Sequence, residues 1–131
     1  DLPDAAYFVY LEEVNFEGRA FYLTEGMVRA SHSRLGKLPY RTLTAQTSNR
    51  RADAQPNTSN RWLSLNIPLL PVSHRFKRGS RLRIVIAGSD KAHFASPSLD
   101  GQKWTVRIGN KSSTLVVPTT SIKPENGMGS E

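Results

Sequence analysis

The chain has 131 residues, no cysteine, and 18 Lys and Arg against 11 Asp and Glu, which gives a formal net charge of +7. This length suits one domain that buries roughly two-thirds of its unfolded surface, and the missing cysteines exclude a disulfide framework and a thiolate metal site. No apolar run approaches the about 20 residues of a membrane span, so no membrane partner is expected; the compartment stays open, with the cytoplasm favoured.

In the first third of the chain, apolar residues alternate with a period of two, which predicts β-strands. Tyr7–Val14 and Ala20–Leu23 are the first two predicted strands, and the tight turn between them contains Gly18, which is free to adopt a positive φ. A short break at Thr24–Gly26 is predicted to precede a third strand, Met27–Ser33.

The segment 33–60 is long, polar and rich in arginine, and it contains Pro39 and Pro56. Loops of this length without their own secondary structure are often functional or disordered. We therefore expect either an ordered excursion from the domain or a mobile surface loop.

Strand patterns return in the second half of the chain. They are predicted at Trp62–Leu69, Arg81–Ala87, Trp104–Ile108 and Thr114–Val117, the last two joined by a turn at 109–112. In Arg81–Ala87 the residues Leu82, Ile84 and Ile86 are expected to face inward. Pro68 suggests that the strand at Trp62–Leu69 ends there or lies at a sheet edge.

Short strands separated by polar turns indicate an all-β protein, specifically a β-sandwich. We expect one domain over residues 1–121 with the long polar loop at 33–60, followed by a flexible C-terminal tail at 122–131, which ends in Gly-Met-Gly-Ser-Glu.

Two separated blocks form a recognisable pattern. The first reads FYLTEGMVRASHS over residues 21–33, and the second reads IPLLPVSHRFKRGSRLRIVIAGSDKAHF over residues 67–94. Both blocks resemble the C-terminal domain of the X-Pro dipeptidyl-peptidase and cocaine-esterase-like (CocE/NonD) serine hydrolases, with Glu25 in place of the commoner Asp. The positions that carry the resemblance are Thr24, Gly26, Arg29, Ala30, Ser73, His74, Phe76, Gly79, Arg81, Arg83, Gly88, Asp90 and Phe94.

The resemblance implies a jelly roll of the galactose-binding-domain-like architecture. The chain does not begin with Met and enters a strand almost at once, so we expect a domain truncated at its N-terminus. The implied function is that of a non-catalytic companion to an upstream α/β-hydrolase domain in the same polypeptide. That domain would supply a Ser-His-Asp triad for hydrolysis of an acyl ester or peptide bond, and this domain would pack on it and shape its substrate cleft.

The residues of this chain offer little chemistry of their own. No Gly-x-Ser-x-Gly elbow is present, so no catalytic residue is assigned and the segment is expected to be inactive alone. His32, His74 and His93 lie far apart in sequence, without the spacing of a metal motif. Neither a metal nor a cofactor is expected.

The expected interface with the hydrolase domain follows from turn positions and charge. It consists of Met27, Arg29, His32, Arg34, His74, Arg75 and Phe76. Arg29 is expected to form either an inter-domain salt bridge or an internal one, for instance to Asp90 or Glu12, with the internal pair favoured. The ring nitrogens of His74 are expected to satisfy backbone groups in the turn before Phe76.

The sequence offers features of three other kinds of partner. A carbohydrate-binding β-sandwich module is the main alternative, since Trp62 or Trp104 would stack on a sugar ring if exposed. Basic clusters occur between His32 and Arg61 and between Arg75 and Arg83, but aromatic residues are not interleaved with them, so nucleic acid is not expected. Missing strands would expose a sheet edge, so self-association of the fragment is expected.

Overall fold

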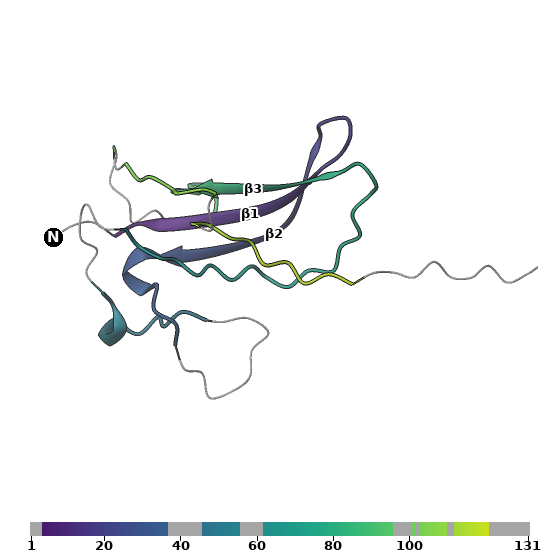
Figure 1. Cartoon of the computed structure of the whole chain (residues 1–131). Helices are drawn as coiled ribbons and strands as arrows, with labels where there is room; N and C mark the ends of the chain where they lie inside the picture. Colours follow the sequence, from purple (N-terminus) through teal and green to yellow (C-terminus); the bar gives the residue numbers. More distant parts are fainter. Residues whose placement is uncertain are drawn as a thin grey trace, which may run out of the picture.

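The computed structural model describes residues 4–36, 46–55, 62–95, 101, 103–109 and 112–120. Its sheet has three antiparallel strands in the order β2-β1-β3, with β1 (Ala6–Val14) in the centre, β2 (Ala20–Arg29) on one side and β3 (Arg81–Ala87) on the other (Figure 1). Two single-turn 3₁₀ helices, η1 (Ala30–His32) and η2 (Arg51–Asp53), are the helices of these ranges. Neither is long and apolar enough to cross a membrane.

The first hairpin follows the predicted pattern. β1 and β2 pair from Ala6 opposite Arg29 to Val14 opposite Ala20. In the turn between them Gly18 adopts a φ of 83°, and its N–H donates to the carbonyl of Asn15 at 3.0 Å. A residue with a Cβ is strained at that φ, which explains the glycine. The prediction for this turn is confirmed, as is the strand at Arg81–Ala87.

The predicted break at Thr24–Gly26 is wrong, because β2 continues through it. The register instead shifts between Leu11 and Glu12: Leu11 pairs with Thr24, but Glu12 pairs with Tyr22. Leu23 is therefore the extra residue of a β-bulge. At its other end β2 stops at Arg29, so the strand predicted to reach Ser33 gives way to η1.

The two faces of the sheet carry different residues. Cross-strand partners share a face, so Val9, Leu11 and Glu13 lie on one face with Ile86, Ile84 and Leu82 opposite them on β3. We call this the Leu11 face. The other side, the Tyr10 face, carries Phe8, Tyr10 and Glu12 of β1 with their partners. Both faces contribute to the core, since the side chains of Phe8 and Leu11 are both buried.

An extended segment that precedes β3 covers part of the Leu11 face. It runs alongside β2 before turning into β3 (Figure 1). The backbone N–H of Leu70 donates to the carbonyl of Glu25 at 2.9 Å, and the Thr24 hydroxyl donates to the carbonyl of Leu70 at 2.7 Å. Trp104 adds to this layer by packing edge-on against Tyr7, with ring centroids 5.5 Å apart.

The fold class predicted from the sequence, an all-β sandwich, is confirmed by this arrangement. The described residues of Trp62–Leu69, Trp104–Ile108 and Thr114–Val117 are extended, but none of them forms a strand with a regular hydrogen-bonded ladder. A turn does join the last two segments, since the Ser112 N–H donates to the carbonyl of Gly109 at 2.8 Å.

Part of the long polar segment 33–60 returns to the sandwich. Leu35 and Thr47 form an antiparallel bridge, and the N–H of Gln55 donates to the carbonyl of Ser31 at 2.8 Å. The rest of this segment, at 37–45 and 56–60, and the tail at 122–131 lie outside the described residues. The domain boundaries therefore stay predictions.

Candidate functional site

Asp4, Arg29, Ser31 and His32 form a hydrogen-bonded cluster where β2 ends. The Asp4 carboxylate accepts from the Ser31 backbone N–H at 2.9 Å and the Ser31 hydroxyl at 2.6 Å, and it pairs with Arg29 at 2.8 Å. Burial alone would raise the pKa of Asp4, but the hydrogen bonds from Ser31 and Ala5 and the charge of Arg29 outweigh it and lower the pKa. Arg29 thus forms an internal pair, as favoured, but with Asp4 and not with Asp90 or Glu12.

This cluster contains a serine, a histidine and an aspartate, yet their order does not suit nucleophilic catalysis. In a Ser-His-Asp triad the imidazole lies between the other two groups and takes the serine proton. Here Ser31 lies in the middle, with its hydroxyl 2.8 Å from His32 Nδ1. Because the Asp4 carboxylate is ionised, it accepts the hydrogen bond that the Ser31 hydroxyl donates, and His32 Nδ1 is left to donate to the hydroxyl oxygen. The arrangement holds the start of η1 and does not activate Ser31.

A second cluster surrounds Glu13, a buried carboxylate of β1 on the Leu11 face. His74 Nε2 donates to one of its oxygens at 2.6 Å, and the backbone N–H of Lys77 donates to the other at 3.1 Å. Hydrogen bonds from Ser80 and His74, together with that of Lys77, lower the pKa of Glu13 to about 2. His74 thus binds a carboxylate and not the backbone groups that the sequence predicted. Its ring also packs edge-on against the ring of Phe76, with centroids 5.0 Å apart.

The Glu13 cluster predicts a specific loss of stability in acid. The pKa of Glu13 is about 2 in the folded chain against an ordinary 4.5, so its ionised form favours folding above pH 4.5 and this contribution disappears as the pH falls toward 2. In Glu13→Gln, the urea midpoint is expected to be lower than wild type at pH 6, and the difference should shrink between pH 4.5 and 2. Glu17→Gln, in the exposed hairpin turn, is the control; a difference for Glu13→Gln that stays constant over this window would contradict the assignment.

The residues predicted at a domain interface fall into two groups. Arg29 pairs with Ala6 at one end of β1, whereas His74 contacts Glu13 near the other end. At the usual rise of a strand these ends are about 23 Å apart. Met27, His32 and Arg34 lie with Arg29, and Arg75 and Phe76 lie with His74; of these, all except His32 are exposed. Their role at an interface stays a prediction.

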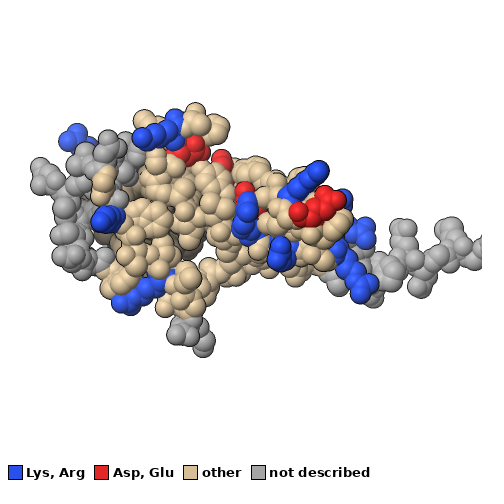
Figure 2. Space-filling view, turned by 90° about the horizontal axis from the view of Figure 1, so that it is seen from above, with Lys and Arg blue, Asp and Glu red and all other residues tan. Residues whose placement is uncertain are grey.

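On the face seen in Figure 2, the charged side chains of the described residues are scattered. Figure 2 shows Lys and Arg at several separate places on the visible face, with a few acidic side chains between them. Some of the basic residues have acidic neighbours, as Arg83 does in Glu12 and Arg29 in Asp4.

The ring of each tryptophan already contacts another residue of this chain, whereas a sugar ring stacks on a free ring face. Trp104 packs against Tyr7, and its indole lies so close to Gly88 that a Cβ there would be 2.6 Å from Nε1. Trp62 is exposed, but the guanidinium carbon of Arg107 lies 3.7 Å above the centre of its ring. The geometry therefore gives the carbohydrate alternative no specific support.

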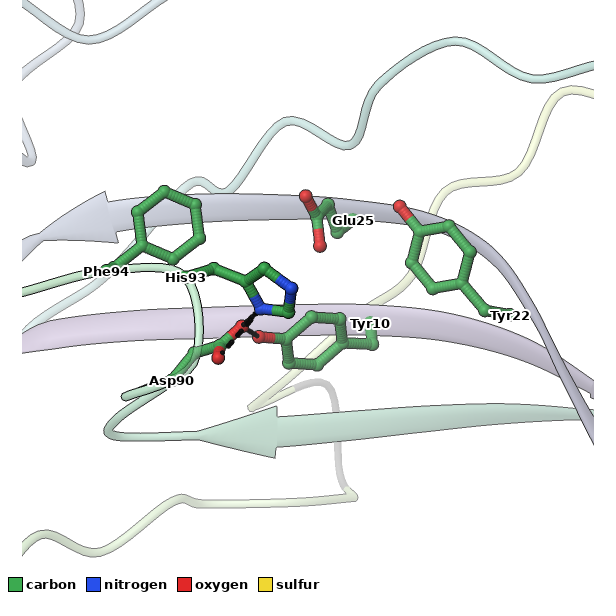
Figure 3. Close-up of a pocket in the computed structure, with 6 residues that line it drawn as sticks. All are labelled: Tyr10, Tyr22, Glu25, Asp90, His93 and Phe94. Atoms are coloured by element: carbon green, nitrogen blue, oxygen red, sulfur yellow. Dashed lines mark hydrogen bonds and ion pairs between the residues drawn. The ribbon is translucent and has the colours of Figure 1, made fainter.

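A cavity of about 360 Å³ opens on the Tyr10 face, and the sequence did not predict it. Figure 3 shows the six residues that line it: Tyr10, Tyr22, Glu25, Asp90, His93 and Phe94. The first three come from β1 and β2, and the last three from the turn after β3. The Tyr10 hydroxyl donates to Asp90 at 2.7 Å, and His93 Nδ1 lies 3.0 Å from the same carboxylate.

The carboxylates of this cavity influence the groups around them. Burial, the hydrogen bond to Asp90 and the charges of Asp90 and Glu25 raise the pKa of Tyr10 to about 12. The hydrogen bond from Tyr10 outweighs burial and, with the contact to His93, lowers the pKa of Asp90. Asp90 is therefore ionised at neutral pH and Tyr10 is protonated. Within the described residues, no group of three or more His, Cys, Asp and Glu is arranged to hold a metal ion.

β3 carries a row of aliphatic side chains that are partly exposed. Leu82, Ile84 and Ile86 point to the Leu11 face as predicted, but their relative exposure is between 40% and 44%. Within the described part of the chain, no strand pairs with the outer edge of β3. A half-exposed aliphatic row thus lies on a strand whose outer edge has no ladder partner among the described residues.

Comparisons with known proteins agree with the two sequence blocks. The family model described as the X-Pro dipeptidyl-peptidase C-terminal non-catalytic domain matches residues 1–110. Two curated relatives, provisionally named serine esterases and coming from Mycobacterium bovis and Mycobacterium tuberculosis, are each 44% identical over 107 residues. The match covers 80% of this chain but only 17% of each relative. No solved structure gives a significant match.

Proposed function

Because the chain belongs to the family of X-Pro dipeptidyl-peptidase C-terminal non-catalytic domains, we propose that it serves a longer serine hydrolase of the esterase or dipeptidyl-peptidase type. In this proposal the β-sandwich packs on an α/β-hydrolase domain of the same polypeptide and forms one wall of its substrate cleft. The bond-breaking groups belong to the hydrolase domain, and the sandwich contributes position and shape.

The observation that carries the proposal is the aliphatic row on β3. Leu82, Ile84 and Ile86 are half-exposed on a face where Leu11 of β1 and Thr24 and Val28 of β2 are buried. Contiguous exposed apolar side chains on a soluble domain are typical of an interaction surface. The outer edge of β3 has no ladder partner among the described residues, which favours a polypeptide partner that would satisfy its backbone groups as well.

The longer protein provides the test. Ile84→Glu is expected to reduce kcat/KM for p-nitrophenyl esters or Ala-Pro-nitroanilide at least about fivefold, because a carboxylate in an apolar interface loses water without gaining a partner. Limited proteolysis should then cut between the two domains more readily. Phe16→Glu, at the exposed tip of the first hairpin, is the matched control and should change neither property.

The 131-residue chain alone gives a complementary result. It is expected to show no turnover with these substrates. It is also expected to self-associate through β3, which size-exclusion chromatography would detect as an elution volume that falls with rising protein concentration. Ile84→Glu should reduce this change in elution volume. Turnover by this chain that disappears when one of its own serines is replaced would contradict the proposal. So would identical proteolysis and kcat/KM for Ile84→Glu and wild type in the longer protein.

A further inference from the structure

The cavity on the Tyr10 face is built by the strand register. Tyr10 and Glu25 are direct cross-strand partners, so their side chains emerge side by side. Tyr22 is three positions from Glu25, and in a regular strand it would point to the opposite face. Because Leu23 is bulged, Tyr22 instead pairs with Glu12. The ring of Tyr22 therefore lies on the Tyr10 face. The bulge thus has a consequence for binding: it adds a second tyrosine to the cavity wall.

The turn after β3 forms the remaining walls. Phe94 packs on Phe8 with ring centroids 5.3 Å apart, which fixes the turn against the sheet. Asp90 is held by Tyr10, and His93 lies beside it. In Figure 3 the side chain of Glu25 lies between Tyr22 on one side and His93 and Phe94 on the other.

The charge of this cavity is opposite to that of the whole chain. The chain carries +7, yet the described residues that line the cavity include two carboxylates and no Lys or Arg. Asp90 already has Tyr10 and His93 as partners. Glu25 is only partly exposed, and within the described residues its carboxylate has no hydrogen bond or ion pair. A partly desolvated carboxylate without a partner is unfavourable, and a cation would relieve this.

Three aromatic rings surround this carboxylate, those of Tyr10, Tyr22 and Phe94. Aromatic faces attract ammonium and guanidinium groups through the ring quadrupole, and the attraction grows when the cation is desolvated. The cavity volume of about 360 Å³ lies at the small end of ligand pockets. That size suits the head and stem of one basic group better than a larger ligand.

We propose that this cavity is a binding site for one organic cation, an alkylammonium or alkylguanidinium group, with Glu25 as its counter-ion and the rings of Tyr10, Tyr22 and Phe94 as its walls. Two sources share this chemistry: a Lys or Arg side chain of a polypeptide, and a free amine or guanidine. The site lies on the Tyr10 face, away from the aliphatic row of β3, so it does not depend on how the sandwich docks.

Matched probes test the charge requirement. The 131-residue chain is titrated with butylguanidinium and with its neutral isostere butylurea at low salt, and binding is followed by the backbone amide NMR shifts of Glu25, Asp90 and His93. We expect butylguanidinium to bind at least about tenfold more tightly than butylurea, since cation–π and ion-pair terms are lost in the neutral probe. Equal affinity for the two probes would overturn the proposal.

Variants test the site itself. Glu25→Gln keeps the shape of the side chain and is expected to weaken butylguanidinium binding about five- to tenfold, and Tyr22→Ala severalfold. Glu17→Gln, in the exposed hairpin turn, should leave binding unchanged. Unchanged affinity in Glu25→Gln with a preserved amide spectrum would overturn the assignment, as would shift changes that map elsewhere on the chain.

A third probe distinguishes the sources. The peptide acetyl-Gly-Arg-Gly-amide presents the same guanidinium with a backbone attached. Binding at least about tenfold tighter than butylguanidinium would identify a polypeptide as the natural occupant, because only the peptide makes backbone contacts. Equal or weaker binding of the peptide would identify a free amine or guanidine.

Discussion

Phe8→Ala is expected to lower the free energy of unfolding by about 3–5 kcal/mol, because it removes a buried aromatic ring from the central strand and leaves a cavity. Phe8 is only 4% exposed and packs on Phe94. The loss should also release the turn that carries Asp90 and His93, since the contact between the two rings fixes that turn. Urea denaturation followed by circular dichroism measures the effect.

A second phenylalanine in the same hairpin serves as the control. Phe16 is 83% exposed in the turn between β1 and β2, so Phe16→Ala should change stability by no more than about 0.5 kcal/mol. If Phe8→Ala fails to fold, Phe8→Leu, which retains most of the apolar volume, should fold with an intermediate loss. Equal midpoints for the Phe8 and Phe16 variants would show that Phe8 is not part of the core.

The regular parts of the sheet could be predicted from the sequence because their information is local. Residues 7–14 are rich in aromatic and aliphatic side chains, and Arg81–Ala87 combines β-branched residues with arginines on alternate positions. Gly18 marks the hairpin turn, which only a residue tolerant of positive φ can form without strain. The strand period and the turn residues were enough to predict these strands and this turn, and the family resemblance supported the prediction of a sandwich.

The errors arise where tertiary structure decides. Thr24-Glu25-Gly26 looks like a turn, but β1 on one side and Leu70 on the other supply the hydrogen bonds that keep it in a strand. The segments at Trp62–Leu69 and Trp104–Ile108 have the alternation of strands without a regular ladder. Alternation in the sequence says nothing of whether the backbone has a pairing partner.

The candidate binding cavity could not be predicted for a related reason. Its two halves are joined by the hydrogen bond between Tyr10 and Asp90, which are 80 residues apart in sequence. Tyr22 enters it only because Leu23 is bulged, and no local signal in the sequence marks that position. In the sequence the counter-ion Glu25 stands out only as a departure from the commoner Asp of the family turn.

Gly26→Ala is expected to produce the second large loss of stability, about 2–4 kcal/mol, from overpacking and from weakened hydrogen bonds to Leu70. A Cβ on Gly26 would overlap the carbonyl oxygen of Pro68 and lie 3.0 Å from its carbonyl carbon. Backbone cannot yield as a flexible side chain does, so the segment before β3 must move away from β2. Both hydrogen bonds that tie Leu70 to β2, from its N–H to Glu25 and from Thr24 to its carbonyl, should lengthen.

Gly36→Ala isolates the cause of this loss. A Cβ on Gly36 would meet the atoms of Ser48 at 3.5 Å, which is an ordinary contact, and its backbone has no positive φ. Both substitutions restrict the unfolded chain to the same degree, so the difference between their urea midpoints reports the cost of crowding Pro68 and Leu69 in the folded state. Faster amide exchange at Leu70 in Gly26→Ala, and not in Gly36→Ala, is expected because the opened segment loses its bond to Glu25. Equal midpoints and equal exchange at Leu70 would mean that the extended segment does not lie against β2, and the second layer of the sandwich would have to be placed elsewhere.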